Sequence, residues 1–323
     1  MSAAPGLVAS MERHQVVLYL GALAAGAAAG LLAPGAGPGL AQAINPVLAA
    51  LLYVTFLQVP VAELGRALRA GRFLAAVLVI NFAVAPLVVA ALFAFLPADQ
   101  AVRLGVLLVL LTPCVDYVIV FSGLAGGSAE RLLAATPLLL IAQLVLLPGF
   151  LLLFLGSELA EVIEPGPFVE AFAVLIAIPL ALAWLTQAWA ARRPAGRRVQ
   201  GAVGTLMVPL MVATLLVVVA SQVPKLGGDL AVVARVVPFY ALFLVVMAPA
   251  GMLVARLFRL DVPASRAVVF TGATRNSLVV LPLALALPDA LAVAAVVVVT
   301  QTLVEVVGMV GYVRAVPRLL PTR

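Results

Sequence analysis

The stretch Thr112–Tyr117 has the sequence TPCVDY, and the stretch Thr271–Ser277 has the sequence TGATRNS. Each interrupts a long apolar run with polar residues and with Pro or Gly, which break helices. Each also carries one charge, Asp116 in the first and Arg275 in the second. Broken helices at membrane depth occur where the open backbone groups line a binding cavity. The pair of stretches therefore predicts a transporter site.

The composition is that of a polytopic membrane protein. The chain is 65% hydrophobic and 10% charged, with a mean hydropathy of +1.26, whereas a soluble domain carries about 25% charged residues. Apolar runs of roughly 20 residues recur along the chain, as transmembrane helices require. They are too long for barrel strands. The net charge of +6 indicates basic flanks of helices in a lipid bilayer and no nucleic-acid partner.

We predict about ten transmembrane helices from the ~20-residue length of a span. Their approximate cores are residues 15–32, 42–60, 73–96, 103–125, 131–155, 168–190, 200–221, 232–257, 263–287 and 290–313. With this count, most basic residues fall on one side of the membrane and most acidic loop residues on the other. Both termini are therefore predicted to be cytoplasmic, in a multi-pass protein of the cell inner (plasma) membrane.

An acidic outer linker, residues 156–167, divides the chain into two halves, 1–155 and 168–323. Each half holds five predicted spans, so the second half enters the membrane from the opposite side, as in an inverted repeat. The two interrupted helices are each the fourth span of their half, and a binding site is expected at such corresponding positions. The predicted fold class is an all-α polytopic membrane protein of ten transmembrane helices in two inverted five-helix repeats.

Three charges remain inside the predicted spans: Asp116, Arg275 and Glu305. If the broken helices cross, Asp116 and Arg275 lie near each other. They then form either a static bridge between the halves or a working pair, in which Arg275 attracts an anion and Asp116 exchanges a proton. Glu305 is either a helix-end acid or a deep one. Its distance of ~15 Å along the helix from Arg314 favours the deep position.

Neutral polar residues accompany these charges at the same depth. Ser, Thr and Asn in membranes often only join helices, and Asn81 and Gln143 are assigned to packing. A lone Cys is most often a small buried hydrophobe, but it is also a soft ligand for a thiophilic substrate. The candidate substrate-binding residues are Thr112, Cys114, Tyr117, Arg275, Asn276 and Ser277, and the candidates for ion or proton coupling are Asp116 and Glu305.

Other classes of function have little support in the sequence. The one His, His14, lies in the N-terminal lead, so no His-based zinc pair and no Ser/His/Asp triad can form at membrane depth. The chain also lacks a Walker-type phosphate loop. We expect no catalytic residue, no metal and no cofactor beyond a coupling ion, H⁺ or Na⁺. An intramembrane enzyme with Cys114 as nucleophile, or a purely structural or sensory membrane protein, are the alternatives.

The chain resembles the bile acid/sodium symporter superfamily, and within it the arsenite-efflux permeases of arsenic resistance. The resemblance lies in Pro113-Cys114 in the fourth span, Asn81-Phe82-Ala83-Val84-Ala85-Pro86 in the third, Arg275-Asn276 in the ninth and Leu303-Val304-Glu305-Val306 in the tenth. It implies a panel domain of spans 1, 2, 6 and 7 and a core domain of spans 3–5 and 8–10, in which the two broken helices cross. It also implies that Cys114 lies at the arsenite site and Asn276 at the crossing.

The chain departs from the pattern of these relatives at several positions. Ser277 and Leu278 stand where the arsenite permeases carry a carboxylate, and Asp116 replaces a small neutral residue. The Glu and Gln of the ninth span in sodium-coupled members are absent, which weighs against sodium coupling of that type. The leading prediction is a secondary transporter, an antiporter that exports arsenite or a related metalloid oxyanion by alternating access, driven by protons. The alternative is a sodium- or proton-coupled organic-anion symporter resembling the bile-acid carriers.

Overall fold

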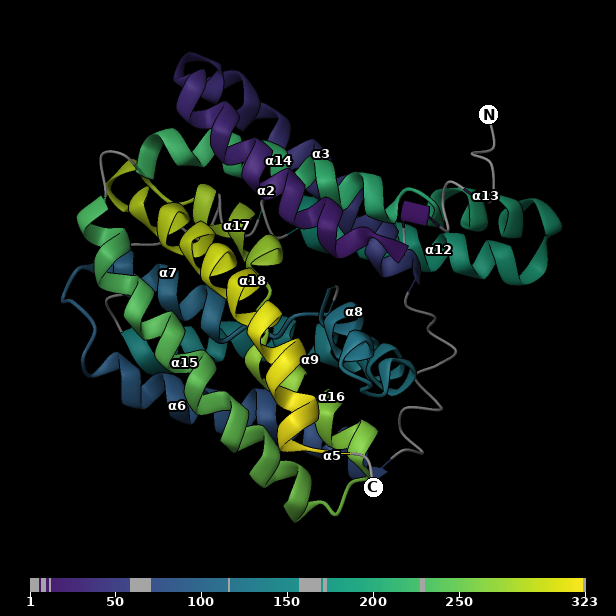
Figure 1. The fold of residues 1–323 in the computed structure, drawn as a ribbon. Helices are drawn as coiled ribbons and strands as arrows, with labels where there is room; N and C mark the ends of the chain where they lie inside the picture. The colour runs from purple at the N-terminus through teal and green to yellow at the C-terminus, as the bar shows by residue number, and fades with distance from the viewer. Residues whose placement is uncertain are drawn as a thin grey trace. The chain divides into compact units, whose positions relative to one another are not determined.

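The computed structural model of the chain describes residues 6, 10–11, 13–58, 71–115, 117–156, 170, 173–226 and 230–321. All regular structure in these residues is helical, and no strand occurs among them, which confirms the all-α class. The chain divides into two compact units: Met1–Pro60 with Val169–Leu230, and Val61–Phe168 with Ala231–Arg323. Figure 1 follows the helices of both units along the chain by colour.

The first unit is a set of helices packed mainly around α3. It contains α2 (Gln15–Leu32), η1 (Pro34–Ala36), α3 (Gly37–Gln58), the π-turn η4 (Ala173–Ala177), α12 (Ile178–Arg192), α13 (Pro194–Gly204) and α14 (Met207–Leu226). Helix α14 packs along α2 and α3, and α12 packs along α3. Gly26 permits the close contact of α2 with α14, because a Cβ there would lie 2.9 Å from the carbonyl oxygen of Leu216. The hydroxyls of Tyr53 and Thr186, 2.9 Å apart, join α3 to α12.

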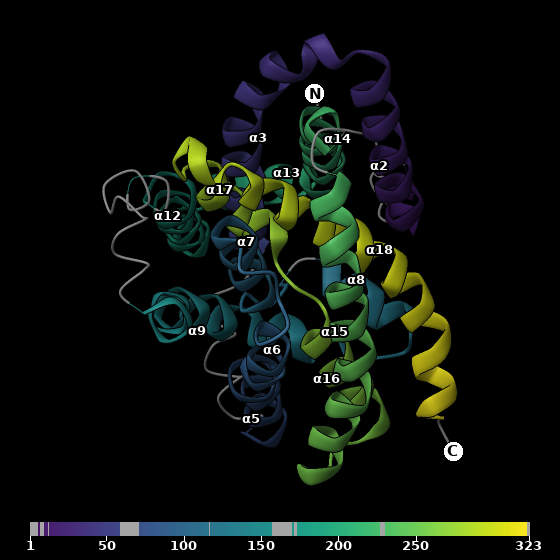
Figure 2. The same ribbon diagram turned by 90° about the vertical axis from the view of Figure 1, so that its left-hand side faces the viewer.

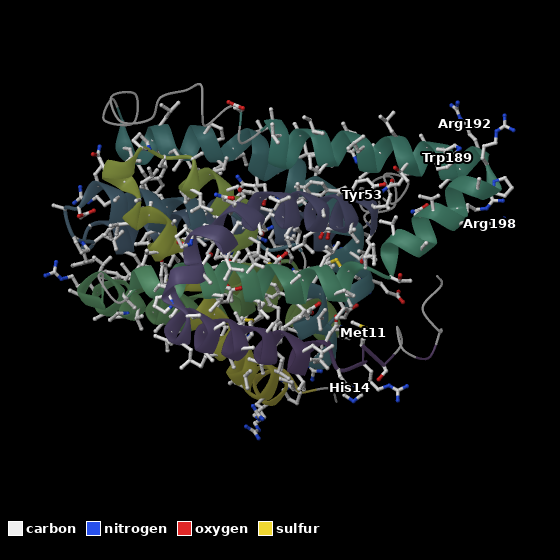
Figure 3. The ribbon with its side chains drawn as sticks, turned by 90° about the horizontal axis from the view of Figure 1, so that it is seen from above. Met11, His14, Tyr53, Trp189, Arg192 and Arg198 are labelled. Atoms are coloured by element: carbon white, nitrogen blue, oxygen red, sulfur yellow. The ribbon has the colours of Figure 1, made fainter. Side chains whose placement is uncertain are left out.

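Helices α12 and α13 form a basic hairpin at one end of this unit. Figure 3 shows Trp189, Arg192 and Arg198 at the hairpin. Pro194 begins α13, where its missing N–H costs nothing. Arg193 is exposed like its neighbours. Exposed Trp and Arg at a helix end are typical of the membrane–water interface.

The second unit holds the interrupted helices. It contains α5 (Gly71–Val79), the π-turn η3 (Ile80–Val84), α6 (Ala85–Phe93), α7 (Gln100–Leu110), α8 (Tyr117–Leu124), α9 (Ala129–Leu155), α15 (Leu230–Leu257), α16 (Val262–Ala273), α17 (Ser277–Leu285), η5 (Asp289–Leu291) and α18 (Val293–Leu319). Helices α5, η3 and α6 follow one another without a gap and form one continuous helical segment, Gly71–Phe93 (Figure 2). Helix α18 packs on α7 and α17, and α16 packs on α5 and α8.

Both sequence interruptions are true helix breaks. Helix α7 has 11 residues and α8 has 8, while α16 has 12 and α17 has 9. At 1.5 Å per residue, no single piece covers a hydrocarbon core of about 30 Å. Each pair of pieces therefore has to act together to cross a membrane.

The described residues contain five helices that are long and apolar enough to cross a membrane. These are Pro34–Gln58, Gly71–Phe93, Met207–Pro224, Ala231–Leu257 and Val293–Leu319, and a sixth is added if the two parts of α9, bent by 48°, count as one span. The broken helices fall outside this count because their pieces are short. The chain is thus a multi-pass membrane protein, while the ten-span inverted repeat stays a prediction.

Gly105 offers a test of the packing between α7 and α18. A Cβ at Gly105 would lie 2.8 Å from the carbonyl oxygen of Ala294 and 2.9 Å from the Val297 side chain. We expect Gly105→Ala to destabilise the protein by about 1–3 kcal/mol, because overpacked cores must shift. Thermal unfolding in detergent measures this, with Gly149→Ala as control, since nothing lies within 4 Å of a Cβ there. Equal melting temperatures for both variants would contradict the packing.

Candidate functional site

The two broken helices cross and pair through their backbones. The Cys114 N–H donates to the Thr274 carbonyl at 3.2 Å, and the Asn276 N–H donates to the Thr112 carbonyl at 2.8 Å. Between these bonds, residue 113 faces residue 275 as a single antiparallel bridge. Backbone groups that a helix would have paired internally are thus paired between the two breaks.

The residues at the breaks explain why the helices stop there. Pro113 has no N–H to continue α7 and restricts the residue before it. The hydroxyl of Thr112 donates back to the Leu108 carbonyl at 2.8 Å, and that of Thr274 donates to Phe270 at 2.9 Å. Both bonds use carbonyls of a last helical turn, and the Phe270 carbonyl also accepts the Thr274 N–H at 3.0 Å.

Helix α17 restarts with a capping residue. The Asn276 side-chain oxygen accepts the Val279 N–H at 3.2 Å, as an N-cap does. Next to it, the Ser277 hydroxyl lies 2.7 Å from that of Thr302 on α18, which donates to it. The start of α17 is therefore fixed to α18 by side chains.

Arg275 places a fully buried guanidinium at the crossing, with 0% of the residue exposed. Its Nη1 donates to the Leu110 carbonyl at 3.3 Å. Its Nη2 donates to Asn81 Oδ1 at 2.9 Å, to the Thr271 carbonyl at 3.1 Å and to the Gly272 carbonyl. The acceptors come from η3, α7 and α16, so one side chain joins three segments.

The Arg275 charge has no carboxylate partner among the described residues, where the only salt bridge is that of Arg131 with Asp261. The Arg275 Cζ instead lies 5.3 Å from the centre of the Phe243 ring, a cation–π contact. Asp116, the predicted partner, lies outside the described residues. The predicted Asp116–Arg275 bridge therefore stays a prediction.

Glu305 of α18 is the buried acid of the site, with 1% of the residue exposed. Its Oε2 accepts the Arg275 backbone N–H at 2.8 Å and the Gln301 amide. Its Oε1 accepts the Tyr117 hydroxyl, which also lies 3.2 Å from the Arg275 carbonyl. The carboxylate thus joins α18 to the first residue of α8 and to the break before α17.

Three side-chain atoms at the crossing lack a hydrogen-bond partner in the described part of the chain: Arg275 Nε, Asn276 Nδ2 and Gln301 Oε1. A buried polar atom without a partner costs about 1–3 kcal/mol. Such atoms in a native site call for an explanation, such as a bound water or ion. Two of the three are donors, which suits an anionic ligand.

The structure brings together the predicted residues that it describes. Thr112, Cys114, Tyr117, Arg275, Asn276, Ser277 and Glu305 all lie at the crossing or in direct contact with it, and all are buried. The proton and substrate roles assigned to them stay predictions. No group of three or more His, Cys, Asp or Glu side chains that could hold a metal occurs among the described residues.

Sequence reasoning missed the supporting residues of the site. Asn81, which the sequence assigns to packing, accepts from the Arg275 guanidinium and donates to the Thr271 hydroxyl at 3.2 Å, so its contacts within the protein hold the site together. Asn81 lies in the π-turn η3, and π-turns often lie at functional sites, so this feature of the structure indicates that Asn81 belongs to the site. Gln301 could have been found from its spacing of one helical turn from Glu305.

The Tyr117 contact can be tested by stability. Tyr117→Phe removes the hydroxyl donor of Glu305 Oε1 and should cost about 1–3 kcal/mol, the penalty for a buried polar group that loses its partner. Tyr53→Phe is the matched control, because it removes a hydroxyl from a half-buried position of the first unit. Thermal unfolding should rank Tyr117→Phe as the less stable variant, and the reverse order would refute the assigned contact.

Comparison with known proteins identifies the family. A family model described as Sodium Bile acid symporter family matches residues 45–229, more than half of the chain. The match includes the first broken helix and ends before the second, so Arg275 and Glu305 lie outside it. No curated protein matches the chain. Members of the family are transporters, which fits the expectation that the chain is not an enzyme. The chain belongs to the sodium bile acid symporter family.

Proposed function

We propose that the chain is a secondary transporter that moves a small organic anion across the membrane by alternating access, coupled to protons. The observation that carries this proposal is the crossing of two broken helices around a buried Arg and a buried Glu. Ionisable groups at membrane depth are costly, by roughly 3 kcal/mol on insertion scales, and mark substrate and ion pathways. The family supports transport of the bile-acid symporter type.

The two units supply the moving parts in this proposal. We infer that the first unit is the panel, the second is the core, and that the chain forms ten spans in two inverted repeats. The stretches Met1–Pro60 and Val169–Leu230 of the first unit are nearly equal in length, and each is followed by a stretch of the second unit. Each stretch of the second unit then contains a long helix, a broken helix and another long helix, which in the first stretch is the bent α9. An inverted repeat would produce this parallel order.

The substrate is proposed to be anionic because of Arg275. Its charge is buried without a salt bridge to any described carboxylate. In a medium of low dielectric, such a charge attracts an anion more strongly than in water. The Nη atoms are occupied by protein acceptors, so direct contact is left to Nε and to Asn276 Nδ2, which lack partners among the described residues.

Proton coupling is proposed to act at Glu305. Its two oxygens accept from three groups, the Tyr117 hydroxyl, the Gln301 amide and the Arg275 N–H. A proton on either carboxylate oxygen turns that oxygen into an O–H donor, which then faces a protein group that is itself a donor. Only the Tyr117 hydroxyl can turn to accept it, since amide and backbone N–H groups donate only. Protonation would therefore change the link between α18 and α8.

Two further parts of the proposal rest on sequence. Asp116 directly precedes α8 and stays a second candidate for proton exchange. Both termini are proposed to be cytoplasmic in the inner (plasma) membrane, because arginines such as those of the α12–α13 hairpin concentrate on that side.

Replacing Glu305 tests the coupling. Glu305→Gln keeps the size of the side chain but removes the titratable group, so we expect accumulation driven by a pH gradient to fall to background. Exchange of labelled for unlabelled solute should persist, because exchange needs no net proton movement. The measurement is solute flux in proteoliposomes with a panel of organic anions, with the pH gradient imposed or absent.

Glu130→Gln is the control for the coupling experiment. Glu130 is an exposed acid at the start of α9, and its replacement changes the net charge equally. We expect wild-type behaviour from it. Unchanged pH-driven accumulation in Glu305→Gln would remove Glu305 from the coupling, and no flux of any tested anion in the wild type would overturn the proposed function.

Export of arsenite or a related metalloid oxyanion is a second candidate function, favoured by one observation. The thiol residue Cys114 is buried directly at the crossing, where its N–H pairs with Thr274 of the other break. Thiolate is a soft ligand that suits a thiophilic metalloid. A single thiol cannot enclose such a species, so binding there would be transient.

Substitution of Cys114 separates the two candidates. If the thiol binds arsenite, both Cys114→Ser and Cys114→Ala should abolish arsenite resistance in cells while organic-anion flux stays near the wild-type rate. Normal organic-anion flux in the same variants excludes a simple packing effect, because a folding defect would lower both activities. Full resistance in either variant would exclude the thiol from arsenite transport.

A further inference from the structure

The crossing contains a cage of oxygens around the Arg275 guanidinium, three of them at Nη2 and one at Nη1. Four oxygens accept from the Arg275 guanidinium: the carbonyls of Leu110, Thr271 and Gly272, and the Asn81 side-chain oxygen. They come from segments far apart in the sequence. Rings of neutral carbonyl oxygens are what proteins use to bind alkali cations in place of water.

The cage is electronegative for a structural reason. Leu110 is the last residue of α7, and Thr271 and Gly272 lie in the last turn of α16. The final carbonyls of a helix have no helical partner and carry the negative end of its dipole. Two helix ends therefore direct partial negative charge at the same place, which favours a cation there.

The cation in that place belongs to the chain itself. The guanidinium Nη2 lies 2.9 Å from Asn81 Oδ1 and 3.1 Å from the Thr271 carbonyl, so the oxygens are already occupied by N–H donors. The family name implies sodium as the coupling ion, and a sodium ion does not fit a cage that holds a guanidinium. Arg275 lies beyond the stretch matched by the family model, which ends at residue 229.

We propose that Arg275 is a tethered cation that fills a cation-binding site at the crossing, so that this protein does not use sodium there. The inference deepens the proposed function. Only its consequence for coupling, that no sodium gradient drives transport through this site, rests on the proposed function. A covalently held charge cannot be released on the other side of the membrane. It supplies the positive charge that the helix ends need, but it cannot transmit an ion gradient.

Removal of the guanidinium should open the site. Arg275→Gln keeps a polar side chain but leaves the four oxygens without their cation, so this variant should acquire sodium binding. We expect its melting temperature in detergent, without any solute, to rise by several degrees when choline chloride is replaced by sodium chloride at equal ionic strength. It should also bind about one radioactive ²²Na⁺ per chain, since a ligand that binds only the folded state stabilises it. The wild type should show neither effect.

Two variants serve as controls. Arg275→Lys retains a positive charge and should stay insensitive to sodium. Arg266→Gln removes another buried Arg of the same unit, whose guanidinium, among the described residues, donates to the carbonyls of Ala125 and Leu320. It should not acquire a sodium response, because two oxygens do not make a cage.

The outcomes decide the inference separately from solute transport. Saturable sodium binding by the wild type overturns it, and so does a folded Arg275→Gln that shows no response to sodium. If Arg275→Gln does not fold, the wild-type measurement decides alone. A wild type that does not respond to sodium supports the tethered cation, and a wild type that responds refutes it. No solute is present in the sodium-binding measurements, so a negative result there does not affect the flux test of the proposed function. A negative flux test likewise does not affect the sodium-binding result.

Discussion

The backbone pairing between the two helix breaks is the constraint on which the site depends. A break in an apolar environment leaves carbonyl and N–H groups open, and each costs free energy unless it finds a partner. Here the break before α8 and the break before α17 supply partners for each other, through the bonds of Cys114 with Thr274 and of Asn276 with Thr112. Neither break would be tolerable alone, so the two have to be positioned together.

The charges of the site match the helix ends that meet at the crossing. Helices α7 and α16 end there, and the cationic Arg275 side chain lies among their terminal carbonyls. Helices α8 and α17 begin there, and the acidic Glu305 accepts from Tyr117, the first residue of α8, and from the N–H that precedes α17 by two residues. Cations at C-terminal ends and anions at N-terminal ends are the favourable arrangement. Two buried charges can thus be stabilised without a salt bridge between them.

Sequence alone predicted the positions of the breaks, because Pro113, Gly272 and the charges beside them contrast sharply with apolar surroundings. It also predicted, from the distance to the basic helix end, that Glu305 lies deep in the membrane, and the structure buries this residue inside the protein. It did not identify the role of Asn81, whose approach to Arg275 depends on a π-turn that no periodicity reveals. Nor could it show that the guanidinium is enclosed by carbonyls, because every residue has a backbone carbonyl and the sequence does not indicate which of them will accept from Arg275.

Residue 275 connects most of the segments that would have to move in a transport cycle. Its N–H donates to Glu305, its carbonyl accepts from Tyr117, and its side chain donates to η3, α7 and α16. In the proposed cycle, a proton on Glu305 Oε1 turns the Tyr117 hydroxyl from donor to acceptor, and a proton on Oε2 competes with the Gln301 amide and the N–H of residue 275. The Tyr117 hydroxyl and that N–H both contact the peptide units that pair the two breaks. A protonation event and a rearrangement of the crossing would then be one process, because they act on the same hydrogen bonds.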